Sequence, residues 1–265
     1  MSAFSALARE ALRDAARRRG LVAAAVASAI AGLAIARCGN CEANVTIQGE
    51  TLSAHAGDLG AAGAILGIAL IALWTYAVAA LLASDGLAAA LEDGVAEAVL
   101  ARPVSRDAFV LARLAGVWLG AFALGAALLA LTAVLSASRS GVTLLPALRA
   151  ALGVGLGAWS VAALAMVVSL SLSRAAALLL FGALGLAVVG IEVAALFGAH
   201  MTGLAGAVAQ GGPAWLAGPV GSLEPWLSEL RLPGPPGWPH ARAIAWAALA
   251  TGVLVARFRR LELPR

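Results

Sequence analysis

Long apolar runs separated by polar segments dominate the chain. In a helix, about 20 apolar residues cross a hydrocarbon core of ~30 Å, and flanking arginines such as Arg19 and Arg37 can extend a short run by snorkelling to the interface. The pattern predicts an all-α membrane protein, one domain over residues 1–265 with six transmembrane helices. The predicted spans are residues 21–36, 61–83, 114–135, 147–172, 175–198 and 241–256.

A weaker pattern precedes the first apolar run. Over residues 2–19, Phe4, Leu7, Ala11 and Leu12 recur at helical spacing on one side, while arginines fall elsewhere. This pattern predicts an amphipathic helix. We expect it to lie on the cytoplasmic membrane surface, and the alternative is an ordinary solvated leader to the first span.

Composition agrees with the hydropathy pattern. Hydrophobic residues make up 62% of the chain and charged residues 12%, whereas soluble domains carry about 25% charged residues. The net charge of +4 does not indicate nucleic-acid binding, because the arginines gather at the ends of apolar runs rather than on one soluble face. The lipid bilayer is therefore the first predicted partner.

The arginines also predict the orientation. Positive residues collect on the cytoplasmic side of membrane proteins, and with the N-terminus inside an even number of spans returns both arginine-rich ends to that side. Only five arginines then fall outside: Arg37, Arg139, Arg149, Arg231 and Arg242. We therefore expect a multi-pass protein with both termini in the cytoplasm.

All 18 basic residues are arginine and none is lysine. A Walker A loop needs a lysine that reaches the nucleotide phosphates, so this chain holds no P-loop. The missing lysine, together with the excess of alanine and glycine, is typical of a GC-rich bacterial genome. No Ser/His/Asp or paired-carboxylate arrangement appears either, so we do not expect an enzyme or a cofactor in this chain.

The most charged internal stretch runs from Ser84 to Arg113 and must lie in water or against a partner. Within it, we predict a short helix from Leu91 to Arg106, ended by Pro103 because proline disfavours helical geometry before it. One side of this helix would be apolar and another acidic. The apolar side holds Leu91, Val95, Ala98 and Val99, and the acidic side Asp93 and Glu97.

Pairs of glycines four residues apart occur in three spans. Such small-xxx-small spacing lets helix backbones approach closely, so helix packing is the predicted role. The pairs are Gly63 with Gly67, Gly116 with Gly120, and Gly153 with Gly157.

Cys38 and Cys41 form a C-x-x-C motif in the predicted outer segment, which also holds His55. An oxidising outer compartment favours a disulfide between them. The alternative is a soft metal site built from Cys38, Cys41 and His55, although two cysteines supply only half of a tetrahedral shell.

Glu192 falls within the fifth predicted span. A carboxylate in lipid costs roughly 3 kcal/mol on insertion scales, so we expect this side chain to face protein or water. Two roles are open, one in a substrate path and one in a structural hydrogen bond to a neighbouring helix.

Residues 91–116 resemble the loop between the second and third spans of ABC-2 type transporter permeases. The matching positions are Glu92, Gly94, Glu97, Val99, Leu100, Pro103, Ser105 and Arg106. The amphipathic opening, residues 6–20, and the basic ending that contains Arg257 and Arg259 also resemble that family. In size and opening the chain is similar to the members that serve nitrous-oxide-reductase maturation, but the outer C-x-x-C is not carried over from them.

The resemblance implies a permease of the bacterial inner membrane that pairs with itself or a homologue and with a separate ATPase subunit. ATP and magnesium would bind that partner, and the substrate would move as the partner hydrolyses ATP. Glu92, Gly94, Glu97, Pro103, Ser105 and Arg106 would form the coupling helix and its end. The alternative is a membrane scaffold that anchors a periplasmic protein or a metallocentre-assembly complex.

Overall fold

The structure, a computed structural model, describes residues 3–17, 45–47, 50–52, 56–101, 104–140, 144–172, 176–177, 179–181, 183 and 239–261. These residues are helical apart from turns and one small hairpin, so the predicted helical class is confirmed. The elements are α1 (Ala3–Arg17), β1 (Val45–Ile47), β2 (Glu50–Leu52), α3 (Ala56–Glu92), α4 (Val95–Leu100), α5 (Arg106–Ser140), α6 (Leu144–Ser169) and α10 (Pro239–Arg259).

Three of the described helices are long and apolar enough to cross a membrane. The qualifying parts are Ile71–Glu92, Arg106–Leu131 and Ala151–Ser169. The shortest has 19 residues, which span about 28 Å at ~1.5 Å per residue. They mark the chain as a membrane-embedded protein and overlap the predicted second, third and fourth spans.

The other predicted spans are covered less fully. Residues 21–36 lie outside the described residues, as do most of residues 175–198. Helix α10 covers the predicted last span, 241–256, but is not among the three helices that qualify by length and composition. The number of six spans therefore stays a prediction.

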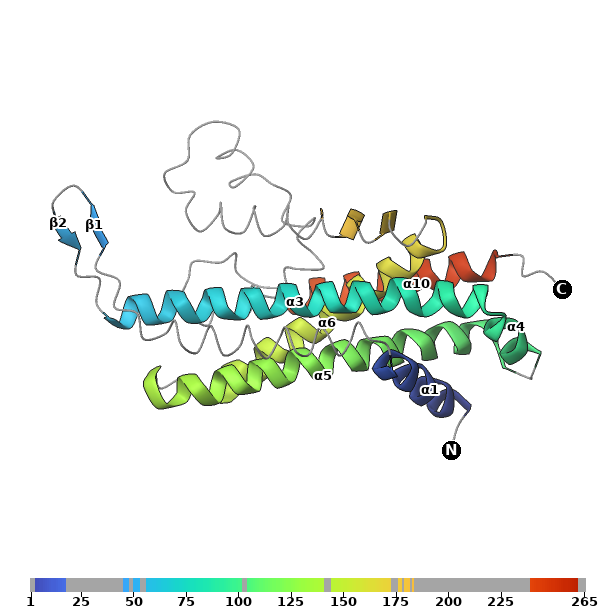
Figure 1. Cartoon of the computed structure of the whole chain (residues 1–265), viewed down its shortest axis with the longest axis horizontal. Helices are drawn as coiled ribbons and strands as arrows, with labels where there is room; N and C mark the ends of the chain where they lie inside the picture. Colours follow the sequence, from blue (N-terminus) through green and yellow to red (C-terminus); the bar gives the residue numbers. More distant parts are fainter. Residues whose placement is uncertain are drawn as a thin grey trace.

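The long helices form an elongated bundle (Figure 1). Helix α3 packs against α5 and α6, and α10 packs against α6 and α5. Helix α1 lies across the first half of α5. Figure 1 also shows that α1, α4 and the last turn of α10 share one end of the bundle, which we call the polar end.

A two-stranded hairpin is the one departure from helix within the described residues. Strands β1 and β2 pair antiparallel, with Val45 opposite Leu52 and Ile47 opposite Glu50. The hairpin lies beyond the start of α3, at the opposite end of the bundle from α4 (Figure 1). The predicted outer segment and the predicted cytoplasmic loop are thus at opposite ends.

Small residues set the helix spacing inside the bundle. A Cβ on Gly125 of α5 would lie 2.8 Å from the Cγ2 atom of Thr75 in α3, closer than real contacts allow. A Cβ on Gly155 of α6 would lie 2.8 Å from the Phe122 ring. Gly155 lies between the predicted pair Gly153 and Gly157, which are both buried as well, so this segment packs closely and the role of that pair stays a prediction.

An aromatic cluster joins α5, α6 and α10. Trp118 stacks on Phe122 at 5.2 Å and meets Trp159 edge-on at 5.3 Å. The Trp118 indole N–H donates to the Gly155 carbonyl at 2.8 Å, and the Trp159 N–H donates to the Thr251 hydroxyl at 2.8 Å. Both indole donors of these partly buried tryptophans are satisfied, as usual for tryptophans inside a protein, which indicates a structural role for the cluster.

Candidate functional site

The polar end begins at a two-residue turn, Asp93 and Gly94, that separates α3 from α4. The Asp93 N–H donates to the Ala89 carbonyl at 2.8 Å and closes α3, and the Ala98 N–H donates to the Gly94 carbonyl at 3.1 Å and opens α4. Gly94 has φ 69° and ψ 5°, in the left-handed region. Glycine adopts this conformation without the penalty that a Cβ imposes. The sequence therefore places a sharp turn between two helices at this position.

Helix α4 is held against the bundle by its apolar residues. Ala96 is fully buried, and Val95 and Val99 are partly buried against the core. Of the predicted apolar side, Val95 and Val99 face the core, whereas Ala98 is exposed. The predicted helix from Leu91 to Arg106 is also too long, because Leu91 belongs to α3 and Gly94 interrupts the helical geometry.

Three carboxylates project from this turn and helix. Glu92, Asp93 and Glu97 are all exposed, and none of them forms an ion pair with another residue that the structure describes. We call these three residues the acidic turn. Because α4 is anchored through Ala96, the acidic turn has a fixed position and presents negative charge at the tip of the bundle.

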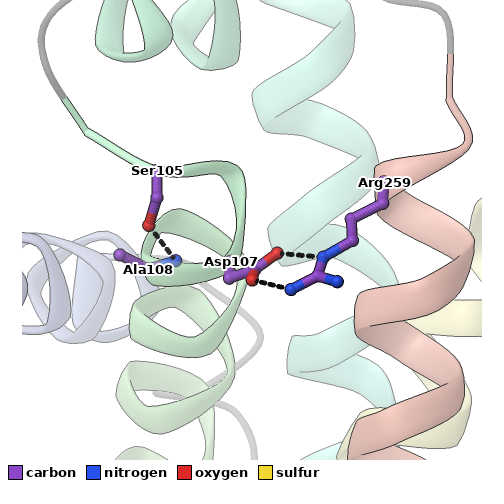
Figure 2. Close-up of polar contacts among 4 residues, drawn as sticks. All are labelled: Ser105, Asp107, Ala108 and Arg259. Atoms are coloured by element: carbon purple, nitrogen blue, oxygen red, sulfur yellow. Dashed lines mark hydrogen bonds and ion pairs between the residues drawn. The ribbon is translucent and has the colours of Figure 1, made fainter.

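Helix α5 starts beside the acidic turn, eight residues before the predicted span at 114. The Ala108 N–H donates to the Ser105 hydroxyl at 3.2 Å, which makes Ser105 the N-cap (Figure 2). A serine in this position satisfies an otherwise unpaired N–H, and Asp107 in the first turn interacts favourably with the helix dipole. Ser105 therefore fixes the point at which the loop after α4 becomes helix.

An ion pair and hydrogen bonds connect the start of α5 to the end of α10. Arg259 donates from Nε to one Asp107 oxygen at 2.8 Å and from Nη2 to the other (Figure 2). Arg106 donates in return to the carbonyls of Arg259 at 3.4 Å and Leu261 at 3.1 Å. These bonds cap the last turn of α10, whose carbonyls lack helical partners. We call Arg106, Asp107 and Arg259 the clasp.

The clasp also stabilises the charged form of Arg259. Hydrogen bonds to the Asp107 carboxylate, together with the attraction of its negative charge, raise the pKa of the Arg259 guanidinium above its ordinary value. An arginine is charged throughout the physiological pH range even without this shift, so the raised pKa reflects the mutual stabilisation of the two charged side chains.

Beneath the clasp, buried aromatic rings extend the connection into the bundle. Phe109 of α5 and Phe258 of α10 are each 1% exposed and stack with ring centroids 6.1 Å apart. The Arg113 guanidinium lies over the Phe109 ring, 5.7 Å from its centroid. A cation in this position is attracted by the negative face of the ring.

Arg113 connects α5 to the N-terminal helix. Its Nη1 donates to the Asp14 carboxylate at 3.1 Å. Next to this ion pair, a Cβ on Gly116 would lie 2.6 Å from the Ala11 Cβ and 2.8 Å from the Ala8 carbonyl oxygen. Helix α1 is therefore seated in a notch that only glycine leaves open.

Part of the apolar side of α1 faces protein. Ala8 and Ala11 are buried against α5, whereas Arg9 and Arg13 are exposed. The predicted amphipathic helix is confirmed, with bounds Ala3–Arg17. Helix α5 covers Ala8 and Ala11, while Phe4 on the same predicted side is exposed, so the expected position of α1 on the membrane surface stays a prediction.

Other predicted site residues lie outside the described residues. These are Cys38, Cys41, His55, Pro103 and Glu192. Their predicted roles in a disulfide, a metal site, a helix end and a substrate path stay predictions. Among the residues that the structure describes, no group of three or more metal-ligating side chains occurs.

The remaining coupling candidates are brought together at the polar end. Glu92, Gly94 and Glu97 form the turn and the face of α4, while Ser105 caps α5 and Arg106 contacts α10. Sequence reasoning missed the partners Asp14, Asp107, Arg113 and Arg259. One sequence feature indicated these pairs: the predicted topology places the acidic and basic residues concerned on the same side of the membrane.

No protein-family model matches the chain, and no curated protein matches it either.

Proposed function

We propose that this chain is the membrane-spanning permease subunit of an ABC transporter, and that the acidic turn and α4 dock onto a separate ATPase subunit. The observation that carries the proposal is the exposed acidic turn, Glu92, Asp93 and Glu97, held in a fixed position by the buried Ala96. A helix that couples two subunits needs a fixed position and an exposed recognition surface. An anchored apolar side gives position, and an exposed charged side gives recognition.

The geometry indicates what kind of surface the partner presents. A turn and a short helix that together carry three exposed carboxylates fit a groove lined by lysine or arginine side chains, because complementary charge steers binding and fixes orientation. The partner also supplies the chemistry, since a chain without lysine has no Walker A loop. ATP and magnesium therefore belong to the partner.

Topology supports a cytoplasmic position for the polar end. Helix α1, the acidic turn and the basic last turn of α10 share this end (Figure 1), and arginine-rich ends face the cytoplasm. In this proposal the chain is a multi-pass protein of the bacterial inner membrane with both termini inside. Two copies, or one copy and a homologue, enclose the substrate path.

Co-purification tests the proposal. The permease is co-expressed with an ATPase that carries a Walker A motif and is encoded in a neighbouring reading frame, and the complex is isolated in detergent. We expect a complex with two permease copies by native mass spectrometry. Its ATP hydrolysis should stop when the Walker lysine of the partner is replaced. If a periplasmic protein co-purifies and no ATPase does, the scaffold function replaces the transporter.

A further inference from the structure

Arg113 is a buried cation whose position depends on α1. It lies seven residues after the start of α5, about 10 Å along the helix axis, and is 8% exposed. Its polar contact among the described residues is the Asp14 carboxylate, supplemented by the Phe109 ring. A guanidinium removed from water needs such a counter-charge. The position of Arg113 is therefore stable only while α1 is docked.

The docking surface for α1 is built into α5 at neighbouring positions. Gly116 follows Arg113 by three residues, so both point to the same side of the helix. The glycine admits the backbone of α1 at Ala8, and the arginine binds the carboxylate at Asp14. These two contacts are about two helical turns apart on α1 and together determine its angle across α5.

A packed route leads from this surface to α4. Phe109 is enclosed between Arg113 and Phe258, and its N–H donates to the carbonyl of Ser105 at 3.1 Å. Ala96 of α4 is fully buried in the same apolar cluster as Phe109. Helix α4 packs against α3 and α5, so a shift at the start of α5 would reach one of the two helices on which α4 rests.

We infer that Asp14 and Arg113 are positioning residues for the acidic turn, so that the docking of α1 sets the affinity of the polar end for its partner. Without the Asp14 carboxylate, the long Arg113 side chain turns toward water at the polar end, as arginines do near helix ends. Its guanidinium then leaves the Phe109 ring and loosens the packing beneath α4. The part of this inference that concerns a partner rests on the proposed function.

Hydrogen–deuterium exchange of the full-length chain in lipid nanodiscs tests the inference without any partner. Asp14→Asn removes the charge and keeps the shape of the side chain. We expect the hydrogen-bonded amides of α4, residues 98–101, to exchange about tenfold faster in this variant, with amides of α6 unchanged. Asp14→Glu should retain slow exchange. Glu10→Gln on the exposed side of α1 is the matched control and should change nothing.

A second variant separates positioning from loss of folding. Asp14→Leu combined with Arg113→Met replaces the ion pair with an apolar pair, which often preserves packing, and we expect slow exchange in α4 to return. The inference is overturned if Asp14→Asn speeds amide exchange in α1 but leaves exchange in α4 slow. The inference is also overturned if, in the double variant, the amides of α1 exchange slowly and those of α4 exchange fast.

Binding of the ATPase then tests the coupling to function. We expect Asp14→Asn to weaken binding of the ATPase by about tenfold, in proportion to the opening of α4. If the ATPase does not bind the wild-type permease, the proposed function is wrong and the exchange result still stands. If it binds wild type and Asp14→Asn equally, the positioning role is wrong.

Discussion

The guanidinium of Arg259 and the carboxylate of Asp107 form a two-point ion pair between residues that are 152 positions apart in the sequence. The pair joins the last turn of α10 to the first turn of α5, and Arg106 completes it by capping the end of α10. The C-terminal end of the chain is thereby attached to the helix that follows the acidic turn. The polar end is one unit made of segments from the whole length of the chain.

Charge exchange tests this attachment. Asp107→Arg and Arg259→Asp should each lower the apparent melting temperature in detergent, because each places like charges together in the clasp. The combined variant, Asp107→Arg with Arg259→Asp, should recover most of the loss. The differences should shrink in high salt, since the side chains are exposed and salt screens them. A combined variant no more stable than either single variant would show that the ion pair does not attach α10.

Gly94 gives a prediction about the turn itself. Gly94→Ala should destabilise the turn between α3 and α4 by about 1–2 kcal/mol, the cost of left-handed geometry for a residue with a Cβ. Space is not the reason, because nothing lies within 4 Å of the added atom. Gly94→Asn should be milder, since asparagine tolerates this geometry. Chemical denaturation monitored at a probe in α4 measures the difference, and equal stability of Gly94→Ala and wild type would contradict it.

Thr75 and Gly125 provide a test of helix packing inside the bundle. The Thr75 hydroxyl donates to the Ile71 carbonyl at 2.7 Å, which fixes the side chain against Gly125. Gly125→Ala should cost about 1–3 kcal/mol through overpacking. Adding Thr75→Ala should remove most of this loss.

Gly252→Ala is the matched control for this packing test, because the added atom has open space on α10. It should be neutral or slightly stabilising, since alanine favours a helix over glycine. Thermal unfolding in detergent separates the variants. If Gly252→Ala lowers the unfolding temperature as much as Gly125→Ala does, glycine is needed for a reason other than space.

The sequence predicted the helical class, the positions of three apolar helices and the location of a polar loop, because these follow from hydropathy alone. Helix ends were less predictable. Helix α5 begins at Arg106 rather than near residue 114, since Ser105 caps it and Asp14 and Arg259 supply partners for its charged first turns. Those partners are distant in sequence, so no local pattern identifies them.

The same limit applies to α1 and its notch. The spacing of Gly116 and Gly120 predicted close helix packing, and the structure shows that Gly116 receives α1 within the same chain. Spacing alone does not say which helix fills a notch. The amphipathic pattern of α1 was equally compatible with a lipid surface, because both lipid and a neighbouring helix cover an apolar side.

Reversing the charge of the acidic turn shows whether this turn docks an ATPase. Glu92→Arg with Glu97→Arg should weaken co-purification of the ATPase by about tenfold or more, because like charges at an interface repel and lose their pairing. ATP hydrolysis by the complex should fall in parallel. Glu10→Arg, an exposed reversal on α1, is the matched control and should leave both values unchanged. Membrane insertion is first confirmed for each variant. Normal binding and hydrolysis in the Glu92→Arg/Glu97→Arg variant would contradict the account.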